Sequence, residues 1–235
     1  MEIKDRIIVA LDVDSLEQAK ALVESLAPHV GCFKVGLELL TAIGAPQVLE
    51  FVHSLGGQVF YDGKFADIPN TVGAAAKAVA GLQVKMFTVH ASSGVEAMMS
   101  AVANRGTSLV LAVTVLTSLD ESNAHLIFGA PTKSKVLQLA RDAKLAGCDG
   151  IICSPQELEL IGSQKELSGL MKITPGIRPK WAAVGDQKRI MTPSEAIKAG
   201  ATALVIGRPI TKPPAVVGSP INAVKRIAEE ISAVL

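Results

Sequence analysis

The sequence predicts an α/β fold, a (β/α)8 or TIM barrel that forms a single domain over residues 1–235. Three observations lead to this prediction. Short runs rich in β-branched residues recur along the whole chain, and helical patterns fill the gaps between them. The strand–helix unit occurs eight times at a spacing of roughly 25–30 residues, which matches a (β/α)8 barrel. No linker, low-complexity tract or shift in composition divides the chain.

The predicted strands are apolar with little alternation, which is typical of strands covered on both faces. A doubly wound sheet is the alternative, but it commonly uses fewer strands and a glycine fingerprint after the first one. Here the first strand ends in LDVDS, without that fingerprint. The predicted strands are IIVALDV (7–13), CFKVG (32–36), QVFYDGK (58–64), MFTVH (86–90), LVLAVTVL (109–116), GIIC (150–153), MKITPGI (171–177) and ALVIGRP (203–209).

Helix start and stop signals lie between these strands. Ser15 precedes the first helix as an N-cap, Gly56-Gly57 ends the second, and Ser-Pro or Thr-Pro opens later ones. The predicted helices cover residues 15–27, 45–57, 70–82, 94–106, 133–147, 154–162, 192–200 and 219–231.

The bulk composition excludes several classes of partner. Lys and Arg total 23 and Asp and Glu total 22, so no overall field favours nucleic acid or an anionic membrane. Aromatic residues make up 3% of the chain, too few for a base-stacking surface. No apolar run reaches the roughly 18 residues of a membrane span and the N-terminus lacks a signal-peptide pattern, so we expect a cytoplasmic protein. The three cysteines lack metal-binding spacing and are expected as buried thiols.

Charged residues gather at the predicted carboxyl ends of the strands, where barrels of this class carry their chemistry. The segment YDGKFADIPNTV (61–72) contains Asp62, Lys64 and Asp67. Residues i and i+2 of a strand share a face, so Asp62 and Lys64 are predicted to point together into the barrel mouth. Lys34 ends the neighbouring strand, and a row of Lys34, Asp62, Lys64 and Asp67 would alternate in charge. Each opposite pair in such a row contributes about 4 kcal/mol at 4 Å before desolvation.

Flanking carboxylates favour the protonated form of Lys64, which predicts a proton donor rather than a base or a Schiff-base nucleophile. Pro69 fixes a turn, and Asn70 or Thr71 is predicted to cap the next helix. The alternative is a surface ion-pair ladder without chemistry. Matching charges at other strand ends count against it.

The last two strands end in residues typical of a phosphate site, which barrels of this class often build there. VIGRPI supplies Gly207 and Arg208, and TPGIRP supplies Arg178. Gly207 lets a backbone N–H approach an oxyanion, and each arginine offers a forked donor. The segment KWAAVGDQKR (180–189) follows, with Gly185 as a predicted hinge, and we expect it to close over a bound phosphate.

In combination, these motifs resemble the orotidine 5′-phosphate decarboxylase family. The resemblance covers essentially the whole chain and rests on LD in the first strand, KVG in the second, D-x-K-x-x-D-I-P-x-T at the third, and VTVLTS, TPGIRP, GDQKRIMTP and VIGRPI in later units. It implies a homodimeric barrel, without cofactor or metal, that converts orotidine 5′-monophosphate to UMP in de novo pyrimidine biosynthesis.

The resemblance also implies a role for each matching residue. Lys64 is the expected proton donor to C6 of the pyrimidine, and Asp62 the neighbour of the departing carboxylate. Asp67 and Thr71 are expected to complete the partner subunit's site. The expected catalytic network is Lys64, Asp62, Asp67 and Lys34, and the other expected substrate-binding residues are Asp12 at the ribose, Ile68 and Thr71 after the third strand, Thr117 and Ser118 at the pyrimidine, and Arg178, Gln187, Gly207 and Arg208 at the phosphate.

Two other functions stay open at this point. A Mg²⁺-dependent sugar-phosphate decarboxylase or aldolase of the same suprafamily shares D-x-K-x-x-D, but it carries an acid as metal ligand where this chain has Lys34. A lysine there repels Mg²⁺. A non-catalytic nucleotide-binding barrel would tolerate the loss of charged network residues, yet all of them are present.

Overall fold

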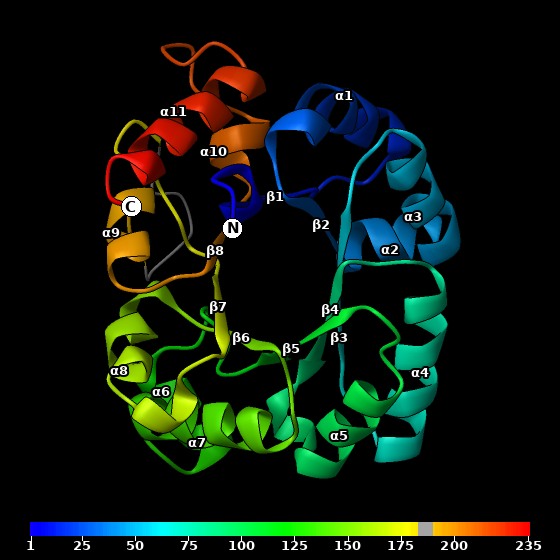
Figure 1. The fold of residues 1–235 in the computed structure, drawn as a ribbon, viewed down its shortest axis with the longest axis vertical. Coiled ribbons are helices and arrows are strands. Elements are labelled where there is room, and N and C mark those ends of the chain that lie inside the picture. Colours follow the sequence, from blue (N-terminus) through cyan, green and yellow to red (C-terminus); the bar gives the residue numbers. More distant parts are fainter. Residues whose placement is uncertain (183–189) are drawn as a thin grey trace.

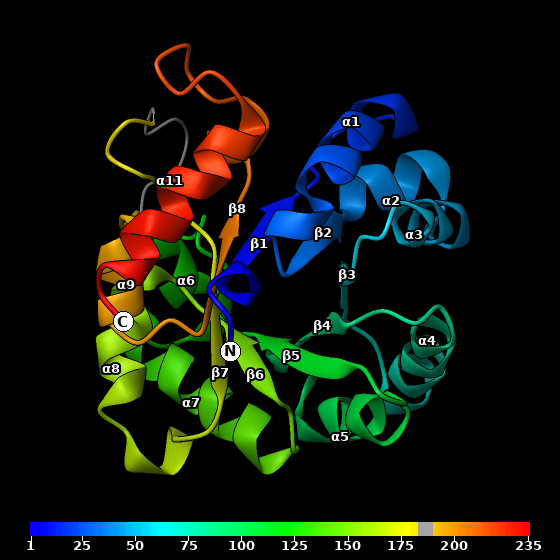
Figure 2. The same ribbon diagram turned by 45° about the horizontal axis from the view of Figure 1, so that its top comes forward.

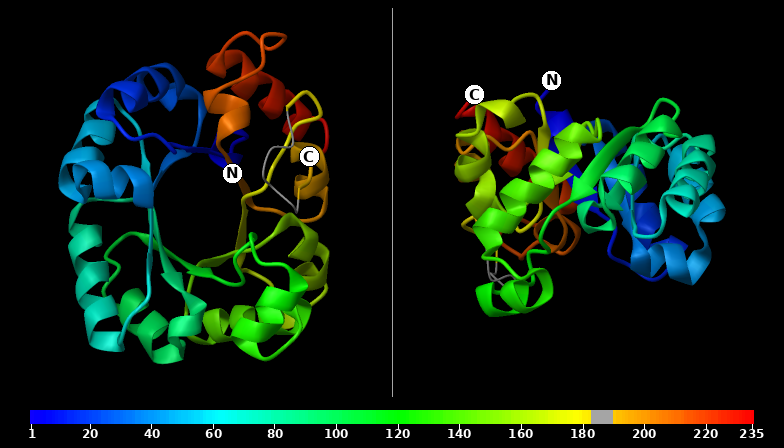
Figure 3. Two further views of the ribbon diagram at one scale, coloured as in Figure 1. Left: turned by 180° about the vertical axis from the view of Figure 1, so that it is seen from behind. Right: turned by 90° about the horizontal axis from the view of Figure 1, so that it is seen from below.

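Eight parallel strands form the centre of the molecule in the computed structural model, which describes residues 1–182 and 190–235. The helices lie outside these strands in a ring (Figure 1). The strands follow one another around the barrel in chain order, and the barrel closes where β8 pairs with β1 (Figure 2). The view from behind shows the same ring of helices (Figure 3). The predicted (β/α)8 fold class is therefore confirmed.

Four strands end three residues earlier than predicted, at Ala10, Val113, Thr174 and Ile206. After β1, β5 and β7 the apolar pattern continues because residues beyond the strand, such as Leu11, Val115 and Ile177, are themselves buried. A buried apolar residue just beyond a strand gives the same sequence pattern as a residue within it. The strands are β1 (Ile7–Ala10), β2 (Cys32–Gly36), β3 (Val59–Phe65), β4 (Met86–His90), β5 (Leu109–Val113), β6 (Gly150–Ile152), β7 (Met171–Thr174) and β8 (Ala203–Ile206).

All the predicted helices are present, but α2, α6 and α10 were not predicted and the segment 154–162 divides into a 3-10 turn and the short α8. The α-helices are α1 (Leu16–Leu26), α2 (Leu37–Ile43), α3 (Ala45–Ser54), α4 (Pro69–Gly81), α5 (Val95–Ala103), α6 (Glu121–Phe128), α7 (Thr132–Leu145), α8 (Leu158–Gly162), α9 (Pro193–Lys198), α10 (Arg208–Thr211) and α11 (Pro220–Ser232). The 3-10 turns are Lys4–Arg6, Ala27–His29, Ala91–Ser93, Pro155–Glu157 and Lys165–Leu167.

Side-chain caps explain some of these helix starts. Asp120 accepts the N–H of Asn123 at 2.9 Å and begins α6, and Thr192 begins α9 with a capping box. The predicted cap of α4 by Asn70 or Thr71 is wrong. That helix begins at Pro69, so both residues lie within its first turn.

The core has two layers. Residues that point inward, such as Ile8, Phe60 and Leu111, fill the barrel, while alternate residues such as Ile7 and Val9 pack against the helices. All three cysteines are free and buried, and burial raises the pKa of each thiol to about 12. None of the helices in the described part of the chain has the length and hydropathy of a membrane-spanning segment.

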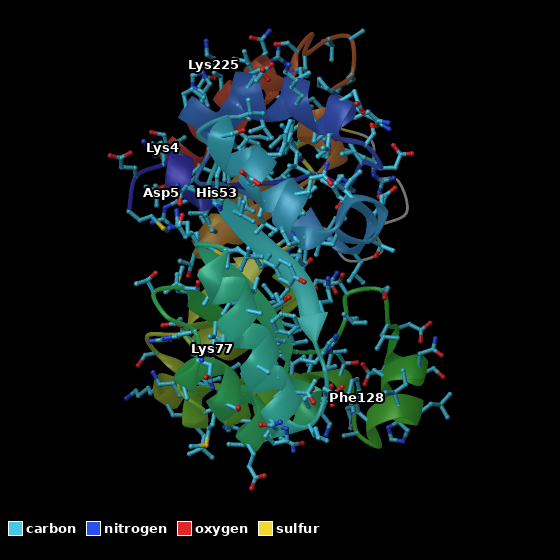
Figure 4. The ribbon with its side chains drawn as sticks, turned by 90° about the vertical axis from the view of Figure 1, so that its right-hand side faces the viewer. Lys4, Asp5, His53, Lys77, Phe128 and Lys225 are labelled. Atoms are coloured by element: carbon cyan, nitrogen blue, oxygen red, sulfur yellow. The ribbon has the colours of Figure 1, made fainter. Side chains whose placement is uncertain are left out.

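The two ends of the filled barrel open on opposite faces of the molecule. In Figure 4, β3 points toward the side on which Phe128 of α6 lies, whereas Lys4 and Asp5 lie on the opposite side. The carboxyl ends of the strands, with the charged residues singled out above, therefore share the face of α6.

Candidate active site

The end of β3 departs from a regular strand. Pairing with β4 is regular at Tyr61↔Phe87 and resumes at Phe65↔Val89, so residues 62–64 lie opposite a single residue, Thr88. A bulge of this kind bends the strand and redirects side chains. Lys64 takes a left-handed backbone with φ of 50°, which costs about 1–2 kcal/mol for a residue with a side chain. Simple alternation, used for the prediction, therefore does not describe how Lys64 reaches the mouth.

Four charged side chains form a row at this mouth. Lys64 Nζ lies 2.8 Å from Oδ2 of Asp62, and Lys34 Nζ lies 3.6 Å from the same oxygen. Lys34 also contacts Oδ1 of Asp12 at 3.0 Å. The side chain of Asp62 is only 10% exposed, so its charge is stabilised mainly by the two ammonium groups and not by water. The row runs Asp12, Lys34, Asp62, Lys64.

Asp67 lies outside this row within one chain. Its side chain is exposed, and its carboxylate accepts the N–H of Ile68 at 2.7 Å. Ile68 is 66% exposed and Thr71 is also exposed. The predicted row that ends in Asp67 is therefore wrong for the single chain, and its fourth member is Asp12.

A cavity of about 190 Å³ opens beside the row. Lys34, Asp62 and Lys64 form its charged wall. The rest of the lining is Phe60, Val113, Val115, Leu116, Thr117, Ile152, Pro175 and Val205. A charged wall facing apolar surfaces suits a flat ring with one reactive edge. Thr117 lines this cavity as expected, whereas Ser118 is exposed and is not among the lining residues.

A second cavity of about 120 Å³ adjoins the first and shares Lys34, Pro175 and Val205 with it. The rest of its lining is Ala10, Asp12, Gly176, Arg178, Gly207 and Arg208. The predicted phosphate residues of the last two units thus meet in one place. Gln187 and Gly185 lie outside the described residues.

Arg178 is buried, at 8% exposure, and its Nη1 donates to the carbonyl of Ile177 at 2.9 Å. Burial and then the charge of Arg208 lower the pKa of its guanidinium, which stays protonated at neutral pH. Two cationic groups that repel each other across a cavity favour an anion between them. The second cavity is therefore suited to a phosphate.

Two polar residues at the end of β4, Thr88 and His90, were not predicted as site residues. Thr88 is fully buried, accepts the N–H of Lys64 at 2.9 Å and donates to Oδ1 of Asp62 at 3.1 Å. Burial lowers the pKa of His90, the Lys64 charge lowers it further, and Asp62 opposes this shift. A β-branched residue in MFTVH indicates only a strand, so no sequence signal identifies Thr88.

The fold and these two cavities define a class, a (β/α)8-barrel enzyme with a charged network and an adjoining anion pocket at the carboxyl ends of its strands. The chain belongs to the orotidine 5′-phosphate decarboxylase / HUMPS family, whose family model matches residues 5–223.

Named relatives and solved structures agree with this membership. The chain is 46% identical to a protein named orotidine 5′-phosphate decarboxylase from Heliobacterium modesticaldum, over 99% of this chain and 98% of the relative. It is 45% identical to a protein of the same name from Moorella thermoacetica, over 100% of this chain and 95% of the relative. A crystal structure of orotidine 5′-phosphate decarboxylase from Lactobacillus acidophilus is 35% identical, with a TM-score of 0.81 over 97% of this chain and 99% of that one.

Proposed function

We propose that this chain decarboxylates orotidine 5′-monophosphate to UMP in pyrimidine biosynthesis, with Lys64 as the proton donor to C6. One observation carries the proposal: the Lys64 ammonium lies 2.8 Å from Asp62 in the wall of a largely apolar cavity, next to a pocket with two arginines. A cytoplasmic location stays a prediction.

The substrate would span the two cavities. Its phosphate would lie against Gly207, Arg178 and Arg208, its ribose beside Asp12 and Lys34, and its pyrimidine in the larger cavity. These positions bring C6 and its carboxylate to the charged wall. The phosphate is far from C6 and does not react. The free energy gained by binding it can therefore be used to position the pyrimidine at the charged wall.

The chemistry then follows from the charges on that wall. When the C6–carboxylate bond breaks, CO₂ leaves and the electron pair stays on C6. The Lys64 ammonium stabilises this developing negative charge and then transfers a proton to C6. Lys64 is left neutral and recovers its proton from water. Asp62 is the expected neighbour of the departing carboxylate.

The magnesium-dependent alternative is disfavoured by the position of Lys34. Its ammonium lies 3.0 Å from Asp12 and 3.6 Å from Asp62, between the carboxylates that a divalent cation would need. Within residues 1–182 and 190–235, no three His, Cys, Asp or Glu side chains gather as metal ligands would. A non-catalytic nucleotide-binding barrel is the second alternative. Turnover of the substrate would exclude it, and binding without turnover would favour it.

We also propose a homodimer in which Asp67 and Thr71 complete the partner subunit's site. Both residues are exposed at the start of α4, next to the equally exposed apolar side chain of Ile68. An exposed carboxylate, hydroxyl and isoleucine on one turn are suited to an interface.

An absorbance assay of orotidine 5′-monophosphate loss tests the activity. We expect turnover that persists in EDTA, loss of turnover in Lys64→Ala, and no change in the control Lys225→Ala, which removes an exposed lysine of α11. Activity that requires added Mg²⁺ would favour the related sugar-phosphate enzyme. Tight UMP binding without turnover would favour the non-catalytic barrel.

A further inference from the structure

We infer that Thr88 is a positioning residue for this reaction, because its single hydroxyl holds both the backbone of Lys64 and the carboxylate of Asp62. The inference rests on the proposed function. It concerns a side chain of β4 that lies behind the charged wall and does not line either cavity.

A threonine hydroxyl can donate one hydrogen bond and accept others, and the hydroxyl of Thr88 does both. Oγ1 accepts the backbone N–H of Lys64 at 2.9 Å and donates to Oδ1 of Asp62 at 3.1 Å. Because Thr88 is fully buried, water does not replace either bond when the hydroxyl is removed. One side chain therefore links the proton donor to the acid beside it.

The bulge in β3 explains why a side chain is needed here. Residues 62–64 lie opposite Thr88 alone, so the regular ladder between β3 and β4 is interrupted over this stretch. The hydroxyl supplies the acceptor for the N–H of Lys64 within that interruption. Lys64 has a φ of 50°, a conformation that persists in a residue with a side chain only where its surroundings hold it.

The second bond orients Asp62. Both ammonium groups contact Oδ2 of this carboxylate, at 2.8 Å from Lys64 and 3.6 Å from Lys34, whereas Thr88 bonds Oδ1. The hydroxyl thus fixes the rotation of the carboxylate that presents Oδ2 to the lysines. Without it, the backbone of Lys64 and the plane of Asp62 are both released, and the ammonium moves relative to C6.

Removal of the hydroxyl should therefore lower kcat with little effect on binding. A misplacement of about 1 Å can cost on the order of 100-fold in rate, so we expect Thr88→Val to lower kcat by about 10- to 100-fold. The phosphate pocket does not include Thr88. Affinity for UMP should therefore change by less than about 3-fold, and Thr88→Ser, which keeps the hydroxyl, should restore most of kcat.

Thr202 offers a matched control at the other end of the barrel. It directly precedes β8, and its Oγ1 accepts the backbone N–H of Lys172 at 2.9 Å, the same type of bond that Thr88 makes to Lys64. Thr202→Val should therefore lower the melting temperature and leave kcat unchanged. The comparison separates a general loss of stability from a loss of positioning.

The inference would be overturned if Thr88→Val lost no more kcat than Thr202→Val, or if Thr88→Ser were as slow as Thr88→Val. Should Thr88→Val not fold, Thr88→Ala and Thr88→Ser decide the question, because they differ only by the hydroxyl. Equal kcat for those two would also overturn it. A wild-type chain without turnover would instead overturn the proposed function, a separately recognisable result.

Discussion

The ammonium of Lys64 lies 2.8 Å from Oδ2 of Asp62, although a bulge and a left-handed backbone separate the two residues. Regular strand geometry would direct both side chains to one face, but it would not fix the distance between the ammonium and the carboxylate. The irregular backbone brings the two charged groups together, and the left-handed conformation of Lys64 is strained. Such strain is typical of sites where position matters more than stability.

Asp62→Asn should lower kcat by about 100-fold or more, because it removes the only charge between the Lys34 and Lys64 ammonium groups in the row and leaves them to repel each other. Steady-state loss of orotidine 5′-monophosphate measures the effect. Asp149→Asn is the control, since Asp149 pairs with Arg105 away from both cavities. Equal kcat in the two variants would show that the charge of Asp62 is dispensable.

Arg208→Ala should raise KM for the nucleotide by roughly 10- to 100-fold, since a hydrogen bond to a charged group contributes about 1.5–3 kcal/mol. Orotidine, which lacks the phosphate, should react equally slowly with the variant and the wild type. The control is Arg226→Ala, an exposed arginine of α11. A variant that loses as much activity on orotidine as on the nucleotide would contradict a phosphate role for Arg208.

Lys64→Ala and Asp67→Ala should each be inactive alone and regain activity when mixed. If Asp67 completes the partner subunit's site, half of the dimers in a mixture are hybrids and one of the two sites in each is intact. The mixture should recover about one quarter of wild-type activity. A mixture that stays inactive while hybrid dimers are demonstrably present would place Asp67 in its own subunit's site.

Acid should destabilise the chain partly through His90. Burial and the Lys64 charge lower the pKa of His90 from its ordinary 6.5, so the unfolded chain takes up this proton more readily than the folded one. The stability that His90 contributes is present above pH 6.5 and is lost as the pH falls through the lowered pKa. Between pH 7.5 and 5.5, the melting temperature of His90→Gln should fall less than that of the wild type, and an equal fall would contradict this account.

Gly63→Ala should destabilise the fold by about 1–3 kcal/mol, because a Cβ there would lie 2.3 Å from Cε1 of Tyr61. The Tyr61 ring packs against Phe65 at a centroid distance of 5.6 Å, a contact that it would lose by moving aside. Adding Tyr61→Leu should relieve the clash, so the two changes together should cost less than their sum. Gly162→Ala, in open space, is the control. Strict additivity of the two changes would show that the contact carries no strain.

Much of the site could be predicted because its signals are local. Asp62 and Lys64 follow an apolar run, and Arg178 and Arg208 follow two others, so a barrel places all four at one mouth. Asp67 also follows the third run, but within one chain it faces solvent and Asp12 takes the outer place in the row. Proximity in sequence does not specify which side chains meet across neighbouring strands.

The barrel and the end at which its charges collect follow from the amino-acid sequence alone, because strand period, helix signals and unit spacing are carried by consecutive residues. The bulge opposite Thr88, the left-handed backbone of Lys64 and the bond from Thr88 to Asp62 arise only in the folded chain. These features depend on the register between β3 and β4, which is set by packing between residues far apart in the chain.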